Sequence, residues 1–319
     1  MPVVRSNYTP PFLFRNGHLS TIYSGLVRSV KHLYQKRQRF KLSDGDFIDL
    51  DWSYANDPTN RLVVLLHGLE GNTQRPYILG SAKIFNANNY DSVSVNFRGC
   101  SGDDNDFYRS YHSGETQDIY ELICYLTART NYSSIFIKGF SLGGNVTLKL
   151  LGEREHIPDQ LRAAIAISVP CDLYGSCVEL HKIKNRPYAN MFKRHLINRL
   201  KRKQKQFPDM VSLEAIRSIK TLKDFDDVYT SKAHGFENAM DYYKKCSSKQ
   251  FLNHISIPTL ILNAKNDSFL SPSCFPIDTA TNSNYIFLEI PEYGGHVGFY
   301  LPGSFYYDDI RSLEFFDQY

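Results

Sequence analysis

The chain has 319 residues, of which 42% are hydrophobic, 14% aromatic and 22% charged, and its formal net charge is +4. This is the profile of a soluble, well-packed globular protein with ample apolar material for a large core. The six cysteines form no CxxC pair and no His/Cys cluster, which argues against a zinc site and a disulfide framework. We therefore expect reduced thiols in a cytoplasmic protein, with no signal peptide and no membrane span.

A helix is predicted over residues 16–30, where Asn16 is a suitable N-cap. Apolar residues recur there at three- and four-residue spacing and form one stripe: Leu19, Ile22, Tyr23, Leu26, Val27 and Val30. We expect this stripe to pack on the protein's own core. A helix on a membrane surface would have a more uniformly basic polar face.

Short β-rich runs then alternate with helical patterns, which is typical of a parallel sheet with helices on both faces. The predicted buried strands are 61–66, 92–97, 134–139, 163–169, 258–263 and 284–290. Residues 171–250 are basic, Tyr-rich and helix-like, without a comparable strand, so we predict a helical cap there. The core would then comprise 1–170 and 251–319, with an N-terminal helical segment at about 10–40.

Basic residues gather in two stretches that lack acidic residues. Eight Lys or Arg precede the first acidic residue, Asp44, and ten lie within 181–207. Two solvated helical faces are the simpler interpretation, and peripheral contact with an anionic membrane or an acidic partner is the alternative. No nucleic-acid partner is expected, because the chain has no recognised motif and no stacking platform among its basic residues.

The strongest local signal is the sequence GFSLGGN at 139–145, which follows a β run and opens a helical pattern. This is the context of a nucleophile elbow, in which Ser141 would project from a strained turn between strand and helix. Gly139 and Gly143 would be small because strand and helix approach closely there. The free N–H groups of the helix N-terminus would face an incoming oxyanion.

A second loop, HGLEG at 67–71, directly follows the predicted strand 61–66. In a fold of this type such a loop supplies an oxyanion-hole N–H, so the expected donors are the backbones of Leu69 and Leu142. His67 lies at a strand end and precedes the serine in the chain. We expect it to make a structural hydrogen bond rather than to act as the base.

A serine nucleophile needs a histidine to take its proton and a carboxylate to orient that histidine, in the chain order Ser, acid, His. Asp267 lies in the loop after the predicted strand 258–263, and His296 lies in a Gly-rich loop after the strand 284–290. Active sites of α/β proteins lie at the carboxyl ends of the strands. Ser141, Asp267 and His296 are therefore the predicted catalytic residues.

The chain resembles an α/β-hydrolase, and more narrowly the YheT-like hydrolases, whose eukaryotic relatives act on lipids. The matching segments extend from about residue 10 to 300: NGHLSTI (16–22), HGLEG (67–71), NFRGCSG (96–102), RSYHSGET (109–116), GFSLGGN (139–145), NAKND (263–267) and GGHVGF (294–299). The resemblance implies Ser141 as nucleophile, Asp267 as acid and His296 as base. The family often has a second Asp and a Pro around the acid, where this chain has Asn266 and Ser268.

The resulting expectation is a serine hydrolase that cleaves carboxylic esters through an acyl-enzyme, without cofactor or metal. The cap would supply Tyr174, Tyr188, Met191 and Phe192 to an apolar acyl pocket. Two alternatives stay open: acyl transfer to an alcohol with the same triad, and a catalytically silent protein that binds lipid surfaces. We interpret residues 109–116 as part of a structural network around Arg98, His112 and Glu115, and substrate binding is the alternative. Oligomeric state is not predicted.

Overall fold

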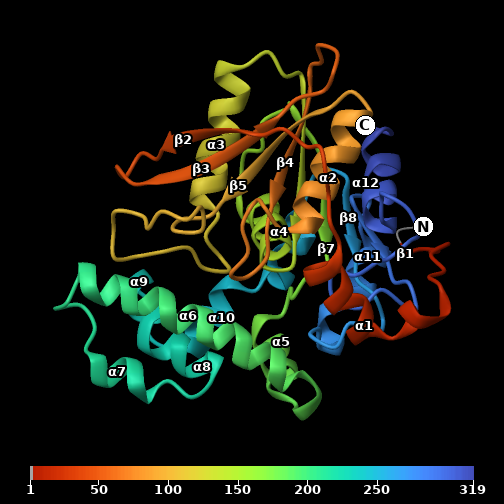
Figure 1. Ribbon diagram of the computed structural model, residues 1–319. Helices are drawn as coiled ribbons and strands as arrows, with labels where there is room; N and C mark the ends of the chain where they lie inside the picture. Colours follow the sequence, from red (N-terminus) through yellow and green to blue (C-terminus); the bar gives the residue numbers. More distant parts are fainter. Residues whose placement is uncertain (1–2) are drawn as a thin grey trace.

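A nine-stranded sheet runs through the computed structural model, which describes residues 3–319 (Figure 1). Its strand order is β1-β9-β8-β7-β6-β4-β5-β3-β2. The strands are β1 Val3–Val4, β2 Lys36–Lys41, β3 Phe47–Ser53, β4 Arg61–Leu66, β5 Asp91–Asn96, β6 Ser134–Phe140, β7 Leu161–Ile167, β8 Thr259–Leu262 and β9 Ile286–Glu289. All neighbours pair in parallel except at β3, which is antiparallel to both β2 and β5. The parallel strands therefore share one carboxyl edge, where α/β proteins place their sites.

Helices cover both faces of the sheet, as predicted for an α/β fold. On one face α2 (Pro76–Ala87) and α12 (Tyr307–Phe316) bury aromatic and aliphatic side chains against the strands. The other face is covered by α3 (Gln117–Arg129), α4 (Leu142–Glu153) and α11 (Ile277–Asn282). The two resulting apolar layers hold β4 and β6 rigidly between them, and both of these strands lead into the candidate site.

A separate group of helices lies below the carboxyl edge of the sheet (Figure 1). These helices have a small apolar core of their own, to which Leu200, Phe225 and Tyr243 contribute. Their bounds are α5 Leu173–His181, α6 Arg186–Gln206, α7 Leu213–Ser218, α8 Leu222–Phe225, α9 Ser231–His234 and α10 Ala239–Cys246. We call α5 to α10 the cap helices; the division of the chain into core and cap remains a prediction. Among residues 3–319, no helix has both the length and the apolar character needed to cross a membrane.

Three strands, the two-residue β1 and the longer β2 and β3, were not predicted from the sequence. β3 is buried along its whole length although Asp49 and Asp51 alternate with its apolar residues. Arg39 of β2 binds the Asp49 carboxylate at 2.9 Å and Arg37 binds that of Asp51 at 2.8 Å. Cross-strand ion pairs therefore hold these aspartates inside the sheet, and an apolar pattern alone does not reveal such a strand.

The predicted packing of the 16–30 stripe is wrong. Only Gly17–Ile22 is α-helical (α1), and a π-helical turn, η2 Tyr23–Val27, follows it. The buried residues are Ser20 and Ser24, whereas the predicted stripe residues Leu19, Ile22, Leu26 and Val27 are exposed. The reason is a close backbone approach: a Cβ on Gly298 would meet the Ser20 hydroxyl, so only small polar side chains fit this contact. The apolar stripe is left facing outward.

Arg28 fixes the end of this N-terminal segment to the core. Its buried guanidinium pairs with Asp309 of α12 and lies 3.8 Å from the centre of the Tyr306 ring. Lys138 of β6 lies beside Asp309 and its neighbour Asp308: the Lys138 Nζ is 3.1 Å from Asp308 Oδ2 and 3.5 Å from Asp309 Oδ1. A buried charge that loses its partner is costly, so this contact strongly favours the observed position of the segment.

We expect Arg28→Met to lower the free energy of unfolding by about 3 kcal/mol, because the buried Asp309 carboxylate loses its closest cation. Urea unfolding followed by circular dichroism measures this. The exposed Lys31→Met is the matched control and should change stability little. Equal losses in the two variants would contradict the anchoring role of Arg28.

Candidate active site

Ser141 occupies the turn between β6 and α4 in a strained backbone conformation. Its φ is 52° and its ψ is −116°, a region that non-glycine residues rarely adopt. The turn is tight on both sides: a Cβ on Gly143 would lie 2.6 Å from the Leu66 carbonyl oxygen, and one on Gly139 would collide with the Gly143 carbonyl. The strand and the helix therefore hold the serine at the carboxyl edge of the sheet.

The structure brings Ser141, Asp267 and His296 together, although they are far apart in the sequence. His296 Nε2 lies 2.9 Å from Ser141 Oγ, and His296 Nδ1 lies 2.8 Å from Asp267 Oδ2. The Asp267 side chain is fully buried and that of His296 is 10% exposed. Asp267 Oδ1 accepts a second hydrogen bond from the Phe269 N–H at 2.9 Å, which fixes the carboxylate plane.

The loop that carries His296 is held by residues from three other segments. The His296 N–H donates to Thr21 Oγ1 of α1 at 2.8 Å, and the Gly295 N–H donates to Asn266 Oδ1 at 2.9 Å. The Val297 N–H donates to Ser168 Oγ at 2.9 Å. Thr21 was not singled out from the sequence. Its segment, NGHLSTI, is one of the segments that resemble the YheT-like hydrolases, but the sequence alone assigns no chemical role to Thr21.

The loop after β4 runs directly beside the serine. A Cβ on Gly68 would lie 3.1 Å from Ser141 Cβ, so the backbone reaches Leu69 at close range. Leu142 is the first residue of α4, and its N–H points out of the unpaired helix N-terminus. Both predicted oxyanion donors therefore lie next to Ser141.

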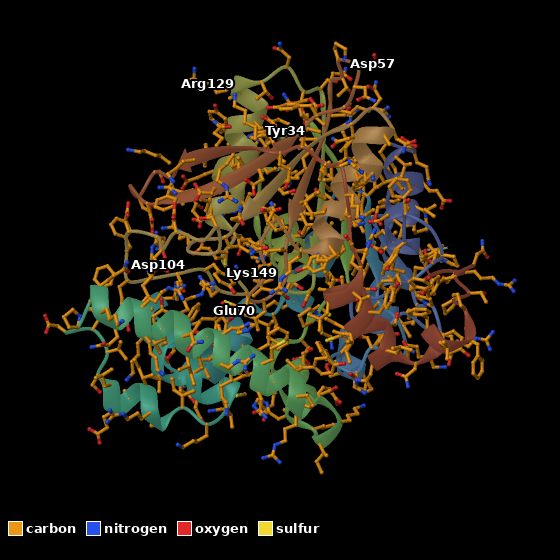
Figure 2. All side chains as sticks on the ribbon, in the orientation of Figure 1. Tyr34, Asp57, Glu70, Asp104, Arg129 and Lys149 are labelled. Atoms are coloured by element: carbon orange, nitrogen blue, oxygen red, sulfur yellow. The ribbon has the colours of Figure 1, made fainter. Side chains whose placement is uncertain are left out.

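Glu70 joins this loop to the cap helices, a connection that sequence reasoning missed. Its carboxylate accepts hydrogen bonds from Tyr111 Oη at 2.9 Å and from Arg199 Nε of α6 at 3.0 Å. Its N–H donates to the same Tyr111 oxygen at 2.8 Å, and its φ is 53°. Figure 2 shows Glu70 between the sheet and the cap helices. Since Arg199 also binds the Gly99 carbonyl at 2.7 Å, the basic stretch 181–207 is partly internal.

A mostly apolar cavity opens from Ser141 and His296 into the cap helices. Its walls combine several core segments around the serine with side chains of α5, α6, α8 and α10. The apolar cap residues among them are Leu173, Leu180, Phe192, Leu196, Phe225 and Tyr243. Of the four cap residues expected to line it, only Phe192 does so. Tyr174 is exposed, and Tyr188 instead lies against His18 and Phe269. Helical phase, which composition does not determine, decides which cap residues face inward.

Comparison with known proteins agrees with this architecture. A family model described as the alpha/beta hydrolase fold matches residues 61–301. YheT of Escherichia coli (strain K12), whose assignment as an esterase is itself provisional, is 34% identical over 303 residues, which cover 92% of this chain and 87% of that protein. The chain belongs to the α/β-hydrolase family and is YheT-like.

Further relatives of this α/β-hydrolase are named as lipid-cleaving enzymes. Human phospholipase ABHD3 is 28% identical over 306 residues, covering 93% of this chain and 75% of that protein. The monoacylglycerol lipase of Saccharomyces cerevisiae is 27% identical over 254 residues, covering 77% and 56%. Among solved structures, the esterase Pf2001 of Pyrococcus furiosus superposes with a TM-score of 0.60 at 15% identity, covering 98% of this chain and 97% of that one. That last likeness concerns the fold alone.

His67 makes the structural hydrogen bond expected of it. The Phe97 N–H donates to His67 Nε2 at 3.3 Å. Burial lowers the pKa of His67 to about 3, so the ring stays neutral at physiological pH. His67 therefore links the start of the loop 67–71 to the backbone that follows β5.

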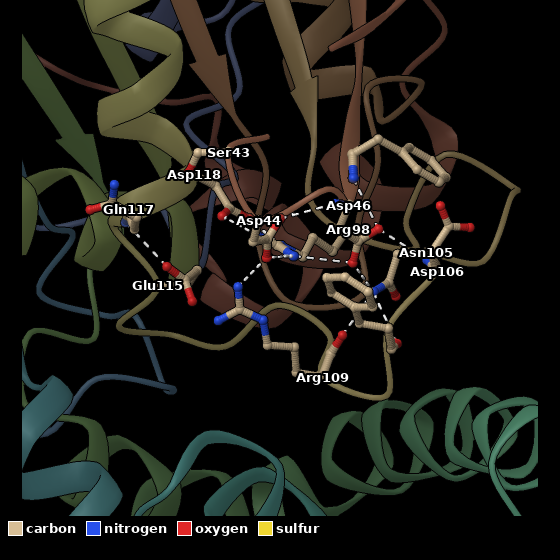
Figure 3. A network of polar contacts seen from close by, with 12 residues as sticks. Ser43, Asp44, Asp46, Arg98, Asn105, Asp106, Arg109, Glu115, Gln117 and Asp118 are labelled. Atoms are coloured by element: carbon tan, nitrogen blue, oxygen red, sulfur yellow. Dashed lines mark hydrogen bonds and ion pairs between the residues drawn. The ribbon is translucent and has the colours of Figure 1, made fainter. Parts of the chain in front are cut away.

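Arg98 anchors the loops around residues 44 and 109, as Figure 3 shows. It binds Asp118 through two hydrogen bonds of 2.7 and 2.6 Å, and it also binds Asp44 at 2.7 Å and Asp46 at 3.1 Å. Arg109 pairs with the same Asp44 carboxylate. The predicted network around Arg98 therefore exists, but its partners are these aspartates, and His112 and Glu115 belong to a neighbouring cluster.

His112, Glu115 and His234 lie in an arrangement that could hold a metal ion, with ligating atoms within 4.8 Å of one another. The Gly114 N–H donates to His112 Nδ1 at 3.1 Å, which leaves the proton of the neutral ring on Nε2. Nε2 lies 3.7 Å from Glu115 Oε2. We describe the group as a buried polar cluster. Burial lowers the pKa of His112 well below its usual value and that of His234 to about 4.

The low pKa of His234 predicts acid sensitivity. As the pH falls from 7 to 5, the unfolded chain protonates this histidine while the folded chain does not, so about 2 kcal/mol of stability is lost over that range. Replacing it by His234→Asn should reduce the loss between pH 7 and pH 5 by that amount, as measured by urea unfolding at both pH values. The exposed His254→Asn is the control. An unchanged pH dependence in His234→Asn would refute the explanation.

Proposed function

We propose that the protein is a serine hydrolase that cleaves carboxylic esters, with Ser141 as nucleophile, His296 as general base and Asp267 as the orienting acid. The observation that carries this proposal is the continuous chain of hydrogen bonds from Ser141 Oγ through both ring nitrogens of His296 to the buried Asp267 carboxylate. A serine hydroxyl is a weak nucleophile at neutral pH, and this arrangement is the one that activates it.

Each step of the proposed reaction uses groups of this chain and water. His296 takes the Ser141 proton as the serine oxygen attacks the ester carbonyl, and the N–H groups of Leu69 and Leu142 bind the resulting oxyanion. Asp267 keeps the ring in the productive tautomer and stabilises its charged form. The intermediate then expels an alcohol that receives the proton from His296. Water activated by the same ring hydrolyses the acyl-enzyme, which restores the serine.

The cavity supports an apolar acyl group as the part of the substrate bound beside Ser141. Its walls are largely aliphatic and aromatic, and a chain of methylene groups gains about 0.8 kcal/mol for each group buried. The relatives named as a phospholipase and a monoacylglycerol lipase support a lipid ester as substrate. Location in the cytoplasm remains a prediction.

Thr21 would act as a positioning residue for this reaction. Its hydroxyl donates to the Gly17 carbonyl at 2.7 Å and accepts the His296 N–H, so it connects α1 to the base through one oxygen atom. Removing that acceptor frees the loop while Ser141 and Asp267 stay in place. The effect should therefore concern the rate of chemistry rather than substrate binding.

Labelling by a fluorophosphonate tests the activated serine. We expect the wild type to be labelled and Ser141→Ala to be unlabelled, with Asp267→Asn and His296→Ala labelled far more slowly.

Hydrolysis of p-nitrophenyl esters of increasing chain length should be fastest for chains that fill the apolar cavity. A folded wild type that stays unlabelled would refute the proposal and favour a catalytically silent lipid-binding protein. Ester formation with added ethanol would instead identify an acyltransferase.

Substitution of Thr21 tests its positioning role. Thr21→Val should lower kcat by about tenfold, equivalent to about 1.4 kcal/mol, and leave KM nearly unchanged. Thr21→Ser retains the hydroxyl and should restore most of the rate. Equal rates for Thr21→Val and Thr21→Ser would show that the hydroxyl does not position His296.

A further inference from the structure

The N-terminal segment has an exposed apolar surface on the side opposite to its contact with the core. We call it the docking surface, and it consists of Phe12, Leu13, Leu19, Ile22, Leu26 and Val27. Phe12 is 80% exposed and Leu26 is 72% exposed. These residues come from three consecutive short helices, η1 (Phe12–Arg15), α1 and η2, which Figure 1 shows in red on the cap side of the molecule, near α5. Isolated exposed apolar residues are ordinary, whereas a continuous group indicates contact with an apolar partner.

The inner side of the same segment supports the candidate active site. Thr21 accepts the His296 N–H, and Ser24 Oγ donates to the Gly298 carbonyl at 2.7 Å. His18 stacks on Tyr188 near the start of α6 with ring centres 5.8 Å apart. The docking surface is therefore separated from the loop of the candidate base by the thickness of one helix.

The segment that carries the docking surface contains basic but no acidic residues. The first 43 residues contain no Asp or Glu, and Arg5, Arg15 and Lys31 are exposed there. Before the start of α6, whose Tyr188 stacks on His18 of α1, Ile183 is 90% exposed between Lys182 and Lys184, and Lys182 pairs with Glu179. Apolar side chains surrounded by Lys and Arg are the combination that binds the interface of an anionic bilayer, where each basic residue near the surface adds about 1 kcal/mol.

The basic stretch 181–207 by itself does not provide such a surface. Arg199 and Lys203 are buried, and Lys203 Nζ donates to the Asn105 carbonyl at 2.7 Å. Arg202 pairs with Asp104 at 3.0 Å. In contrast, within residues 3–319, Arg15, Lys31, Lys184 and Arg186 make no ion pair with a carboxylate. Free positive charge is therefore available next to the docking surface, as it also is at the exposed Arg194, Lys201 and Lys205 farther along α6.

We infer that the docking surface binds a bilayer that contains anionic lipid, with Phe12, Leu13, Leu26 and Val27 inserted among the acyl chains. Docking there would place His296 and the cavity beside the bilayer, so that a lipid ester could pass from the membrane toward Ser141. The binding surface stands independently of the proposed function, and only this substrate route rests on it.

Cosedimentation with phosphatidylcholine vesicles, with and without phosphatidylserine, tests the inference. The Ser141→Ala protein is used so that the lipids stay intact. We expect binding that requires phosphatidylserine and weakens as salt screens the basic residues. The double variant Leu26→Gln/Val27→Gln should bind at least about tenfold more weakly, because it replaces methyl groups on the inserted face by polar amides.

Matched controls separate this surface from other exposed groups. Met210 and Leu213, which lie near α7, are 59% and 50% exposed, so Met210→Gln/Leu213→Gln makes an equivalent change elsewhere. Lys184→Gln/Arg186→Gln should weaken binding more than Lys201→Gln/Lys205→Gln on α6. Made instead with Ser141 present, all four double variants should hydrolyse a short soluble ester at the wild-type rate when the proposed function holds.

The inference would be overturned if Leu26→Gln/Val27→Gln and Met210→Gln/Leu213→Gln bound vesicles with equal affinity. It would also be overturned if the Ser141→Ala protein without further changes did not bind. A third outcome would also overturn the inference: the protein forms a dimer without vesicles, and Leu26→Gln/Val27→Gln dissociates that dimer. A second copy of the chain would then cover the docking surface. Fluorophosphonate labelling of the wild type separates the two proposals. Vesicle binding without labelling would refute the serine hydrolase but support the docking surface. Labelling without vesicle binding would support the serine hydrolase but refute the docking surface.

Discussion

The close approach of β6 and α4 at Ser141 is the constraint on which the rest of the site depends. Packing of Gly143 against the carbonyl of Leu66 draws the loop after β4 and the start of α4 to the same point. The serine consequently keeps a backbone conformation that costs on the order of 1 to 3 kcal/mol and that only a well-packed sheet can maintain. The buried strands and the two helical layers supply that support, which explains why the site lies at the centre of the carboxyl edge.

The remaining groups reach Ser141 from parts of the chain that are distant in sequence. Asp267 and His296 follow neighbouring strands, while Thr21 comes from the N-terminal segment that Arg28 anchors to α12. Glu70, beside the expected oxyanion donor Leu69, is held by Arg199 from the cap helices. A displacement of either the N-terminal segment or the cap would therefore reach the reacting groups through one or two hydrogen bonds. This arrangement couples the outer surfaces of the molecule to the proposed chemistry.

The sheet and the proximity of Ser141, Asp267 and His296 could be predicted because each residue follows a buried strand in a fixed chain order. Other features depend on contacts that a local pattern does not contain. β3 was missed because Asp49 and Asp51 are neutralised by arginines on another strand. The 16–30 stripe was placed on the wrong side because its small residues, not its apolar ones, fit against the Gly-rich loop. The cap residues that line the cavity depend on helix orientation, which composition leaves open.

The central claim is that Ser141 is activated by His296 and becomes acylated. Rapid mixing of the protein with a p-nitrophenyl ester tests it most directly, through the amount of p-nitrophenol released before the steady state. The account predicts a burst of one equivalent per chain that disappears in Ser141→Ala, with the acyl group found on the Ser141 peptide by mass spectrometry. A linear release without a burst, at the same steady rate in the wild type and in Ser141→Ala, would contradict it.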